Sequence, residues 1–366
     1  MRLSSIITQF EAEFLAQYQA RLLPSHHQAL AAMKDCRNPL GPNMQATCEH
    51  CQEHAWVPHS CGHRLCPHCQ AHESQQWIER QLAKQIPAEY FLLTFTLPAQ
   101  FRALAWRHQR CVYDRMTQCA WETVRTFCRN DRQLQGIPGA TTVLHTHSRR
   151  LDFHPHVHMI VPGAAVNAKQ RLWRTKRCRG KGRYLFSEKA LAKVFRAKLL
   201  EAMTQAGLAL PKAYPEDWVV DCKAVGGGEK ALVYLGRYLY RGVIQEKDII
   251  ACEEGQVTFR YREAKSKQLM HRTLPGAQFL WQILQHVMPK GFRRARNYGF
   301  LHPNSKRLIQ LLQILLNLDP HRSQSAMSAR PRIVCRCCGA VMKIIRTGVL
   351  PGSGYRIKAA VPPLVM

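Results

Sequence analysis

The sequence predicts an α+β protein built around a ferredoxin-like or RRM-like sheet. Between residues 86 and 255, short apolar, β-rich runs alternate with longer amphipathic stretches in the order β-α-β-β-α-β-α, which is the order of a split βαβ sheet with one added helix. In front of this region, two C-x2-C pairs predict a zinc-binding module. The 366 residues, 46% of them hydrophobic, suffice for buried cores in two or three domains.

The predicted elements follow from changes in periodicity along the chain. Residues 1–34 and 75–85 are expected to be helical around the cysteine-rich segment. The central region is expected to have strands at 90–97, 141–147, 153–161 and 217–225, and helices at 100–130, 187–207 and 229–241. A short strand at 257–261 and helices at 278–287 and 305–318 predict a mostly helical C-terminal region. We therefore expect three domains: 1–85, 86–255 and 256–366.

The charge balance favours nucleic acid as the partner. Lys and Arg number 53 against 24 Asp and Glu, a formal charge of +29, and a polyanion relieves the self-repulsion of such an excess. A membrane is not expected, because no run of about 18 apolar residues occurs. The first residues also lack the pattern of a secretory signal, which predicts a cytoplasmic, nucleoid-associated protein.

Two segments concentrate this positive charge and are expected to contact DNA phosphates. Residues 169–183 contain eight basic and no acidic residues, and residues 260–307 are almost as one-sided. A solvated charged face is the alternative interpretation of each. The candidate DNA-binding residues are Arg174, Lys176, Arg177, Arg179, Arg237, Arg293, Arg294 and Arg296.

The cysteines near the N-terminus have the spacing of a zinc site. Cys48 and Cys51 form one C-x2-C pair, and Cys66 and Cys69 form a second pair 15 residues later. Two tight turns of this kind can present four thiolates to one tetrahedral Zn²⁺. The sequence therefore predicts a structural zinc ion held by these four residues.

Other cysteines leave the ligand set open. Cys36 and Cys61 lie close enough in the sequence to form a second site or to replace a ligand, although Cys36 could equally be a buried apolar residue. Cys335 and Cys338 form a third C-x2-C pair that resembles half a zinc ribbon. This pair could close with a distant ligand, with another chain, or as a purely structural thiol cluster.

A histidine-rich strand is the first candidate catalytic element. His156 and His158 are two apart, so they project from the same face of an extended strand toward one metal ion. A divalent ion held in this way would keep open positions for phosphate oxygens.

Two tyrosines supply a candidate nucleophile. Tyr234 and Tyr238 are four apart and therefore share one face of the last predicted helix, with Arg237 between them. A phenol with a pKa near 10 needs a polarised phosphate to act as a nucleophile. Attack would leave a 5′-phosphotyrosine and a 3′ hydroxyl, and the second tyrosine could take a second strand.

The motifs occur in an order that resembles a known family. SCGHRLCPHCQ, VLHTH followed by HPHVHMIVPG, YLGRY and FRRARNYGFL together resemble the rolling-circle HUH, two-tyrosine transposases of the insertion-sequence-91 family. The resemblance implies an HUH nuclease domain in which His156 and His158 bind catalytic Mg²⁺ or Mn²⁺ and Tyr234 and Tyr238 are the nucleophiles. The third metal ligand usual in such domains is not fixed by the sequence, and the candidates are His154 on the same predicted strand and His145 and His147 on the preceding one. It also implies that the zinc module assists recognition of single-stranded or hairpin transposon ends. The alternatives are a rolling-circle replication initiator or relaxase, and a non-catalytic zinc-dependent DNA-binding protein.

Overall fold

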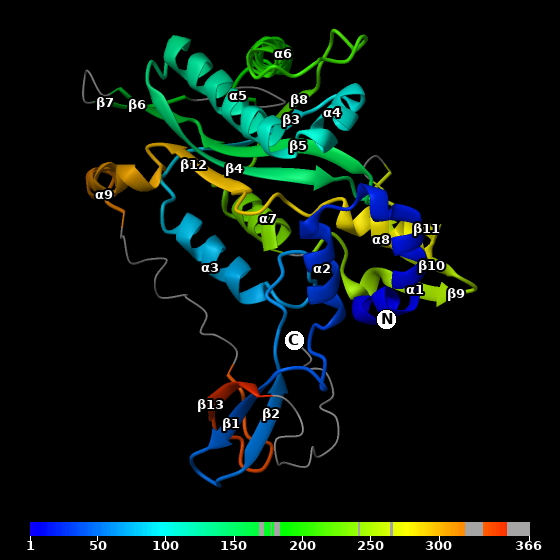
Figure 1. The fold of residues 1–366 in the computed structure, drawn as a ribbon. Coiled ribbons are helices and arrows are strands. Elements are labelled where there is room, and N and C mark those ends of the chain that lie inside the picture. The colour runs from blue at the N-terminus through cyan, green and yellow to red at the C-terminus, as the bar shows by residue number, and fades with distance from the viewer. Residues whose placement is uncertain are drawn as a thin grey trace.

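Four antiparallel strands form the centre of the protein, as Figure 1 shows. The computed structural model describes residues 1–167, 172–176, 178, 184–240, 242–263, 266–318 and 332–349. The central strands are β3 (Tyr90–Thr96), β4 (Ile137–His147), β5 (Phe153–Pro162) and β8 (Val220–Ala224). They lie in the order β4-β5-β3-β8, and each neighbouring pair is antiparallel. This arrangement confirms the predicted ferredoxin-like α+β class.

Three further strands extend the sheet beyond the elements that the sequence predicted. They are β6 (Ala164–Asn167), β7 (Leu172–Thr175) and β12 (Ala295–Gly299). The short strands β6 and β7 continue the sheet beside β4, and β12 also pairs with β4. The partner of β12 lies about 150 residues earlier in the chain, so local periodicity carries no sign of this pairing.

One face of the sheet is covered by helices that make an apolar core. The helices are η2 (Ala99–Phe101), α4 (Arg102–Arg107), α5 (Gln109–Asn130) and α6 (Glu188–Gln205). The single helix predicted at 100–130 is interrupted at His108. Phe91, Leu93 and Phe95 of β3 point into this core together with Val157 and Met159 of β5.

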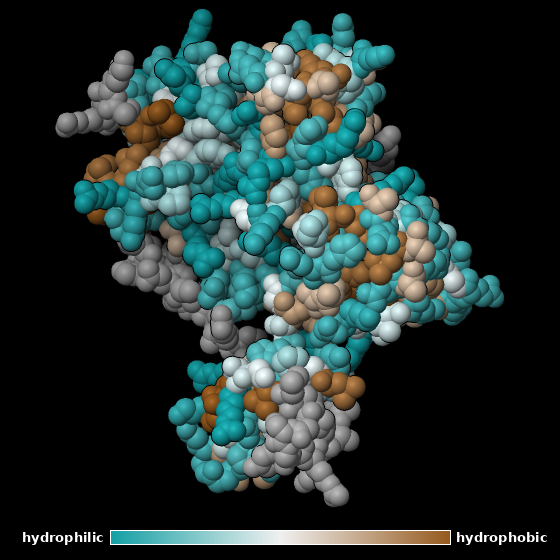
Figure 2. Space-filling model, viewed as in Figure 1, coloured by the Kyte–Doolittle hydropathy of each residue, from teal (hydrophilic) through white to brown (hydrophobic). Residues whose placement is uncertain are grey.

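The opposite face lies against α7 (Glu229–Tyr240) and its neighbours α3 (Ala71–Leu82) and α9 (Lys306–Leu315), with the short η4 (Pro303–Ser305) before α9. Val143 of β4 and Ile160 of β5 face this side and pack near Leu232 and Leu235 of α7. The outer side of α9 stays apolar and exposed, visible as a brown patch at the upper left of Figure 2.

A second core brings the N-terminal and C-terminal regions together. The core is made by α1 (Leu3–Tyr18), α2 (Pro24–Lys34), β9 (Ile249–Glu253), β10 (Gln256–Arg262), β11 (Leu269–Pro275) and α8 (Gly276–Leu284). The short helices η1 (Gln19–Arg21) and η3 (Glu246–Asp248) connect these elements and contribute no buried residue. The strands β9, β10 and β11 form their own antiparallel sheet. The expectation of a mostly helical C-terminal region therefore needs correction, because four strands fall between residues 256 and 349.

A small lobe lies apart from the central sheet and the second core, at the bottom of Figure 1. It contains β1 (Asn43–Cys48), β2 (His54–Pro58) and β13 (Met342–Val349), in the sheet order β13-β1-β2. The lobe therefore combines a hairpin from the predicted N-terminal zinc module with a strand from the predicted C-terminal region. Among the described residues, no helix is both long and apolar enough to cross a lipid bilayer.

Candidate active site and metal centres

Three histidines meet on the sheet face that α7 covers. His156 and His158 alternate with Val157 along β5, so the imidazoles point toward α7 while the valine enters the opposite core. His145 of β4 lies directly across from His156 in the strand register. One ligand atom from each of the three rings lies within 4.8 Å of the others. Of the three candidates for a third ligand, His145 is thus the one that joins the pair.

The hydrogen bonds of these rings leave a nitrogen available on each. His156 Nδ1 bonds the carbonyl oxygen of His154 at 2.7 Å, and His158 Nδ1 bonds Thr94 Oγ1 at 3.0 Å. Such bonds fix the ring orientation and leave Nε2 as the ligand atom. His145 Nε2 is buried and has no hydrogen-bond partner within the described part of the chain. An orphaned buried nitrogen beside two oriented imidazoles fits a bound metal cation.

The electrostatics of the site also suit a cation. Burial lowers the pKa of His156 to about 3 and that of His158 to about 4. Burial, followed by the nearby rings of His158 and His156, also holds the pKa of His145 well below its usual value. All three rings are therefore neutral near pH 7, which is the form that ligates metals.

The other two histidine candidates have different partners. A hydrogen bond of 2.9 Å joins His147 Nδ1 to the hydroxyl of Tyr238. His154 accepts a hydrogen bond of 2.9 Å from the guanidinium of Arg102. Neither ring belongs to the group of three, because a shift in the β4–β5 register separates His145 from His147 and Arg102 holds His154.

The two candidate tyrosines of α7 both approach the histidines, but in different ways. The ring of Tyr238 stacks on that of His145 with centroids 3.3 Å apart, and burial raises the pKa of its phenol well above the usual value. Tyr234 is 48% exposed, and its ring centroid lies 6.3 Å from that of His158. One phenol is therefore open to solvent beside the histidines, whereas the other is enclosed and hydrogen-bonded.

The glycine between the tyrosines allows α7 to sit where it does. A Cβ at Gly236 would lie 2.3 Å from Ile78 Cγ1 on α3, a distance that no side chain tolerates. The carbonyl of Gly236 also accepts a hydrogen bond of 2.9 Å from Ser74 of α3. The helix α3 begins two residues after Cys69 and packs against α7. The segment that contains Cys69 therefore leads directly into the helix that supports the two tyrosines.

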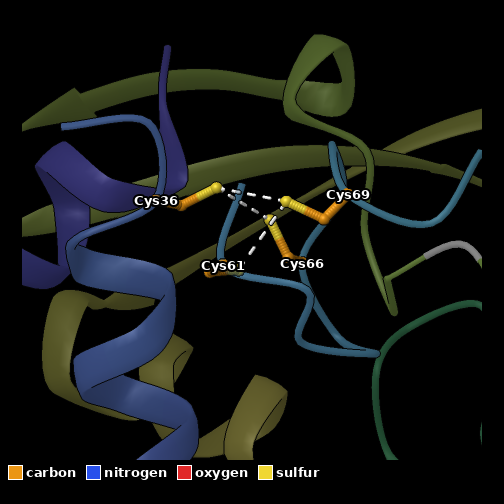
Figure 3. Close-up of side chains that lie close together, drawn as sticks. All are labelled: Cys36, Cys61, Cys66 and Cys69. Atoms are coloured by element: carbon orange, nitrogen blue, oxygen red, sulfur yellow. Dashed lines mark hydrogen bonds between the residues drawn. The ribbon is translucent and has the colours of Figure 1, made fainter. Parts of the chain in front are cut away.

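Four cysteines converge beside the second core, as Figure 3 shows. Cys36 follows α2, and Cys61, Cys66 and Cys69 come from the loop before α3. The Cys36 sulfur lies 3.3 Å from that of Cys69 and 3.5 Å from that of Cys66, and Cys61 lies 3.7 Å from Cys69. Four thiols at these distances suit one structural Zn²⁺.

The predicted zinc ligand set is therefore wrong in its grouping. Cys48 and Cys51 do not join Cys66 and Cys69, because the β1–β2 hairpin carries the first pair into the small lobe. The secondary candidates, Cys36 and Cys61, take their place. The spacing of the cysteines favours a site made of the two regular C-x2-C pairs. The one sign of a different grouping in the sequence is that six cysteines, more than one zinc site needs, lie between residues 36 and 69.

Among the predicted DNA-binding residues, Arg294 is corrected by the structure. Its side chain is only 5% exposed. It donates to the carbonyl oxygens of Leu144 on β4 and Leu239 on α7, each at 3.4 Å, and lies over the Tyr238 ring. A guanidinium enclosed in this way holds α7 against the sheet and does not reach a DNA backbone.

The remaining predicted DNA-binding residues differ in whether another side chain already engages them. Lys176 forms an ion pair of 2.5 Å with Asp131, and Arg296 forms one with Asp114, so their charges are already compensated. Arg174 donates to Gln135 at 2.7 Å. Exposed side chains are found at Arg237 and Arg293, whereas Arg177 and Arg179 lie outside the described residues.

Comparisons with known proteins agree on one class. Residues 6–97 match the insertion-sequence-91 family model described as "Transposase zinc-binding domain", and residues 139–308 match the one described as "Putative transposase". The chain is 30% identical over 324 residues to the "Putative transposase y4qJ" of Sinorhizobium fredii (strain NBRC 101917 / NGR234), covering 81% of this chain and 79% of that protein. It is 28% identical over 273 residues to the "Transposase for insertion sequence element IS801" of Pseudomonas savastanoi pv. phaseolicola.

The second of these alignments covers 69% of this chain and 63% of the IS801 protein, so the chain spans less than two thirds of that relative. Among solved structures, the relaxase TrwC complexed with a 27-mer DNA has a TM-score of 0.26 at 13% identity, covering 63% of this chain and 74% of that one. TrwC in complex with mutant oriT DNA has a TM-score of 0.27 at 16% identity, with the same coverage. Superpositions this partial support no statement about the present chain.

A zinc-binding module followed by a transposase region defines the class of protein: an enzyme of mobile elements that cleaves DNA. Because the match to y4qJ extends over most of both chains, this chain belongs to the insertion-sequence-91 family of transposases. Members of this family act by rolling-circle transposition.

Proposed function

We propose that this transposase is an HUH enzyme that cuts and joins single strands of DNA through tyrosine. In this proposal, His145, His156 and His158 hold a divalent cation, Mg²⁺ or Mn²⁺, and Tyr234 and Tyr238 are the nucleophiles. The observation that carries the proposal is the stacking of Tyr238 on His145 in a site where all three imidazoles are neutral and two of them are oriented by hydrogen bonds. A cation bound there would withdraw charge from the scissile phosphate.

The proposed reaction exchanges one phosphate ester bond for another. A tyrosine Oη attacks phosphorus, an O–P bond to tyrosine forms, and the bond from phosphorus to the 3′ oxygen breaks. The leaving 3′ oxygen takes a proton from water, and the phenol loses its own. For Tyr238, His147 Nδ1 lies 2.9 Å from the hydroxyl, in position to accept that proton. Joining is the reverse attack by a 3′ hydroxyl on the phosphotyrosine.

The two tyrosines are expected to differ in when they act. Tyr234 is exposed beside the histidines and can meet an incoming strand without rearrangement. The Tyr238 ring is enclosed against His145, so an incoming strand reaches its hydroxyl less readily. We therefore infer that Tyr234 makes the first cut and that Tyr238 takes the second strand.

A single-stranded or hairpin transposon end is the proposed substrate. Arg237 stands exposed on α7 between the two tyrosines, and exposed Arg293 precedes β12. Both can neutralise strand phosphates, and exposed Tyr184, which directly follows the basic segment 169–183, can stack on a base.

The test is the formation of a covalent protein–DNA adduct. The protein is incubated with Mg²⁺ or Mn²⁺ and labelled single-stranded oligonucleotides from the ends of its element, and adducts are resolved on a denaturing gel. We expect Tyr234→Phe to reduce the first adduct more than Tyr238→Phe, and the double variant to abolish it. Tyr240→Phe is the matched control on the same helix and should react normally. An undiminished adduct in the double variant would overturn the proposal.

A further inference from the structure

The small lobe contains a second group of four cysteines. Cys48 is the last residue of β1 and Cys51 lies in the turn after it, whereas Cys335 and Cys338 precede β13. The sulfur of Cys48 lies 3.5 Å from that of Cys338, and the sulfur of Cys51 lies 3.4 Å from that of Cys335. The residues in these two pairs are separated by 290 and 284 positions in the chain.

The two C-x2-C loops have the same backbone geometry. The Cys48 amide donates to the Glu53 carbonyl, and the Cys335 amide donates to the Ala340 carbonyl, each at 2.8 Å. One position before these acceptors, the amides of Gln52 and Gly339 donate back to the carbonyls of Cys48 and Cys335, each at 2.9 Å.

Both of these donor residues adopt a left-handed conformation, with φ of 59° at Gln52 and 71° at Gly339. A non-glycine residue rarely adopts this conformation without a constraint. The same turn is therefore built twice, and each copy points its two thiols at the other pair.

Within the described part of the lobe, little apolar surface is buried around β13. The buried cluster there consists of Ala46, Cys48, Cys335 and Met342, with the half-buried Cys51, Ala55, Ile333 and Ala340 packed against it. Much of β13 is exposed, and its register with β1 is irregular between Asn43 and Ala46. Domains with so little buried surface are usually held together by disulfides or by a metal.

Metal binding fits the distances, and a disulfide does not. A disulfide requires sulfurs about 2.05 Å apart, whereas four thiolates at about 2.3 Å from a tetrahedral Zn²⁺ lie about 3.8 Å from one another. The measured separations of 3.4 and 3.5 Å are near the second value. The four sulfurs lie mutually within 4.8 Å.

We propose that Cys48, Cys51, Cys335 and Cys338 bind a second structural zinc ion that closes the lobe. This site is distinct from the one formed by Cys36, Cys61, Cys66 and Cys69, and two of its ligands lie far outside the matched zinc-binding domain at residues 6–97. The second ion fastens β13 to the β1–β2 hairpin. These three strands lie side by side in the lower lobe of Figure 1. The proposal does not depend on the tyrosine chemistry.

Zinc stoichiometry in the full chain is the first test. In a His156→Ala background, which disrupts the three-histidine group, protein purified with zinc chloride and desalted should contain about two zinc ions per chain by elemental mass spectrometry. Cys335→Ser/Cys338→Ser and Cys48→Ser/Cys51→Ser should each contain about one. The matched control is Cys337→Ser, because Cys337 is exposed in the same loop and lies outside the group of four; it should retain both.

Hydrogen exchange then identifies which part of the fold each ion holds. In Cys48→Ser/Cys51→Ser, the amides of β13 should lose protection although no residue of β13 is changed. In Cys36→Ser/Cys61→Ser, one zinc should be lost while β13 stays protected. If a serine variant does not fold, Cys338→His keeps a four-ligand site and should retain two ions. One zinc ion in the unmodified protein, or unchanged β13 protection without Cys48 and Cys51, would overturn the proposal.

Discussion

Both faces of the central sheet are covered by helices, but the two faces serve different purposes. On β3, Phe95 points toward α5 and α6 and packs on Phe195 with ring centroids 4.9 Å apart. One residue earlier, Thr94 points toward α7 and hydrogen-bonds His158. Because side chains of a strand alternate between faces, the same seven residues build an apolar core on one side and orient a proposed metal ligand on the other.

The comparison shows what allows a cluster of polar side chains to be buried in the fold. The core toward α5 is mainly apolar, whereas the α7 face carries a cluster of buried polar groups that need hydrogen-bond partners. His156, His158 and Tyr238 have them, and Arg294 fastens β4 to α7. Among the three histidines of the proposed metal site, His145 Nε2 has no partner in the described residues, and it marks the proposed cation position.

The largest effect is expected from His156→Ala, which should reduce catalysis on the α7 face and leave the apolar core on the α5–α6 face intact. Removing a ligand weakens the proposed charge stabilisation by several kcal/mol, so adduct formation should fall by about 10²-fold or more. The adduct assay measures this change. His271→Ala, at an exposed position of β11, should have little effect. Full adduct formation by His156→Ala would contradict the proposed catalytic role of the histidines.

The next effect is expected from Phe95→Ala on the opposite face. Deleting a fully buried phenylalanine leaves a cavity and should lower the free energy of unfolding by about 3–5 kcal/mol. Urea denaturation measures this loss. The variant should still form adduct at temperatures where it stays folded. A stability equal to that of the unmodified protein would mean that the α5–α6 face is not the principal core.

The smallest effect is expected from Thr94→Val, which keeps the side-chain shape and removes one hydrogen bond to His158. Loss of such an orienting bond should weaken Mn²⁺ binding by about 10–100-fold. A titration of adduct yield against Mn²⁺ concentration should show a higher half-saturation and a recovered maximum. A lower maximum with an unchanged half-saturation would contradict an orienting role.

The candidate site was predictable where local spacing determines direction. The i, i+2 spacing of His156 and His158 and the i, i+4 spacing of Tyr234 and Tyr238 place each pair on one face of its element. His145 was one of three candidates, because its choice depends on the β4–β5 register and on the irregularity before His147. Local periodicity does not encode that register.

The cysteines and arginines show where local pattern misleads. Two regular C-x2-C pairs predicted one zinc site, but each pair completes its tetrad with other cysteines, Cys36 and Cys61 in one case and a pair nearly 290 positions away in the other. Arg294 was assigned to DNA because its neighbours are basic. The structure buries it against two carbonyl oxygens instead.

By itself, the sequence determined the ferredoxin-like order of elements, the histidine strand, the tyrosine helix and the basic character of this transposase, because each depends on residues within a few positions of one another. Only the tertiary structure decided which histidine lies beside His156 and His158 and how the cysteines are grouped. It also decided that β12 pairs with β4, that β13 pairs with β1, and which arginines reach solvent. Those features depend on contacts between residues far apart in the chain, which only folding brings together.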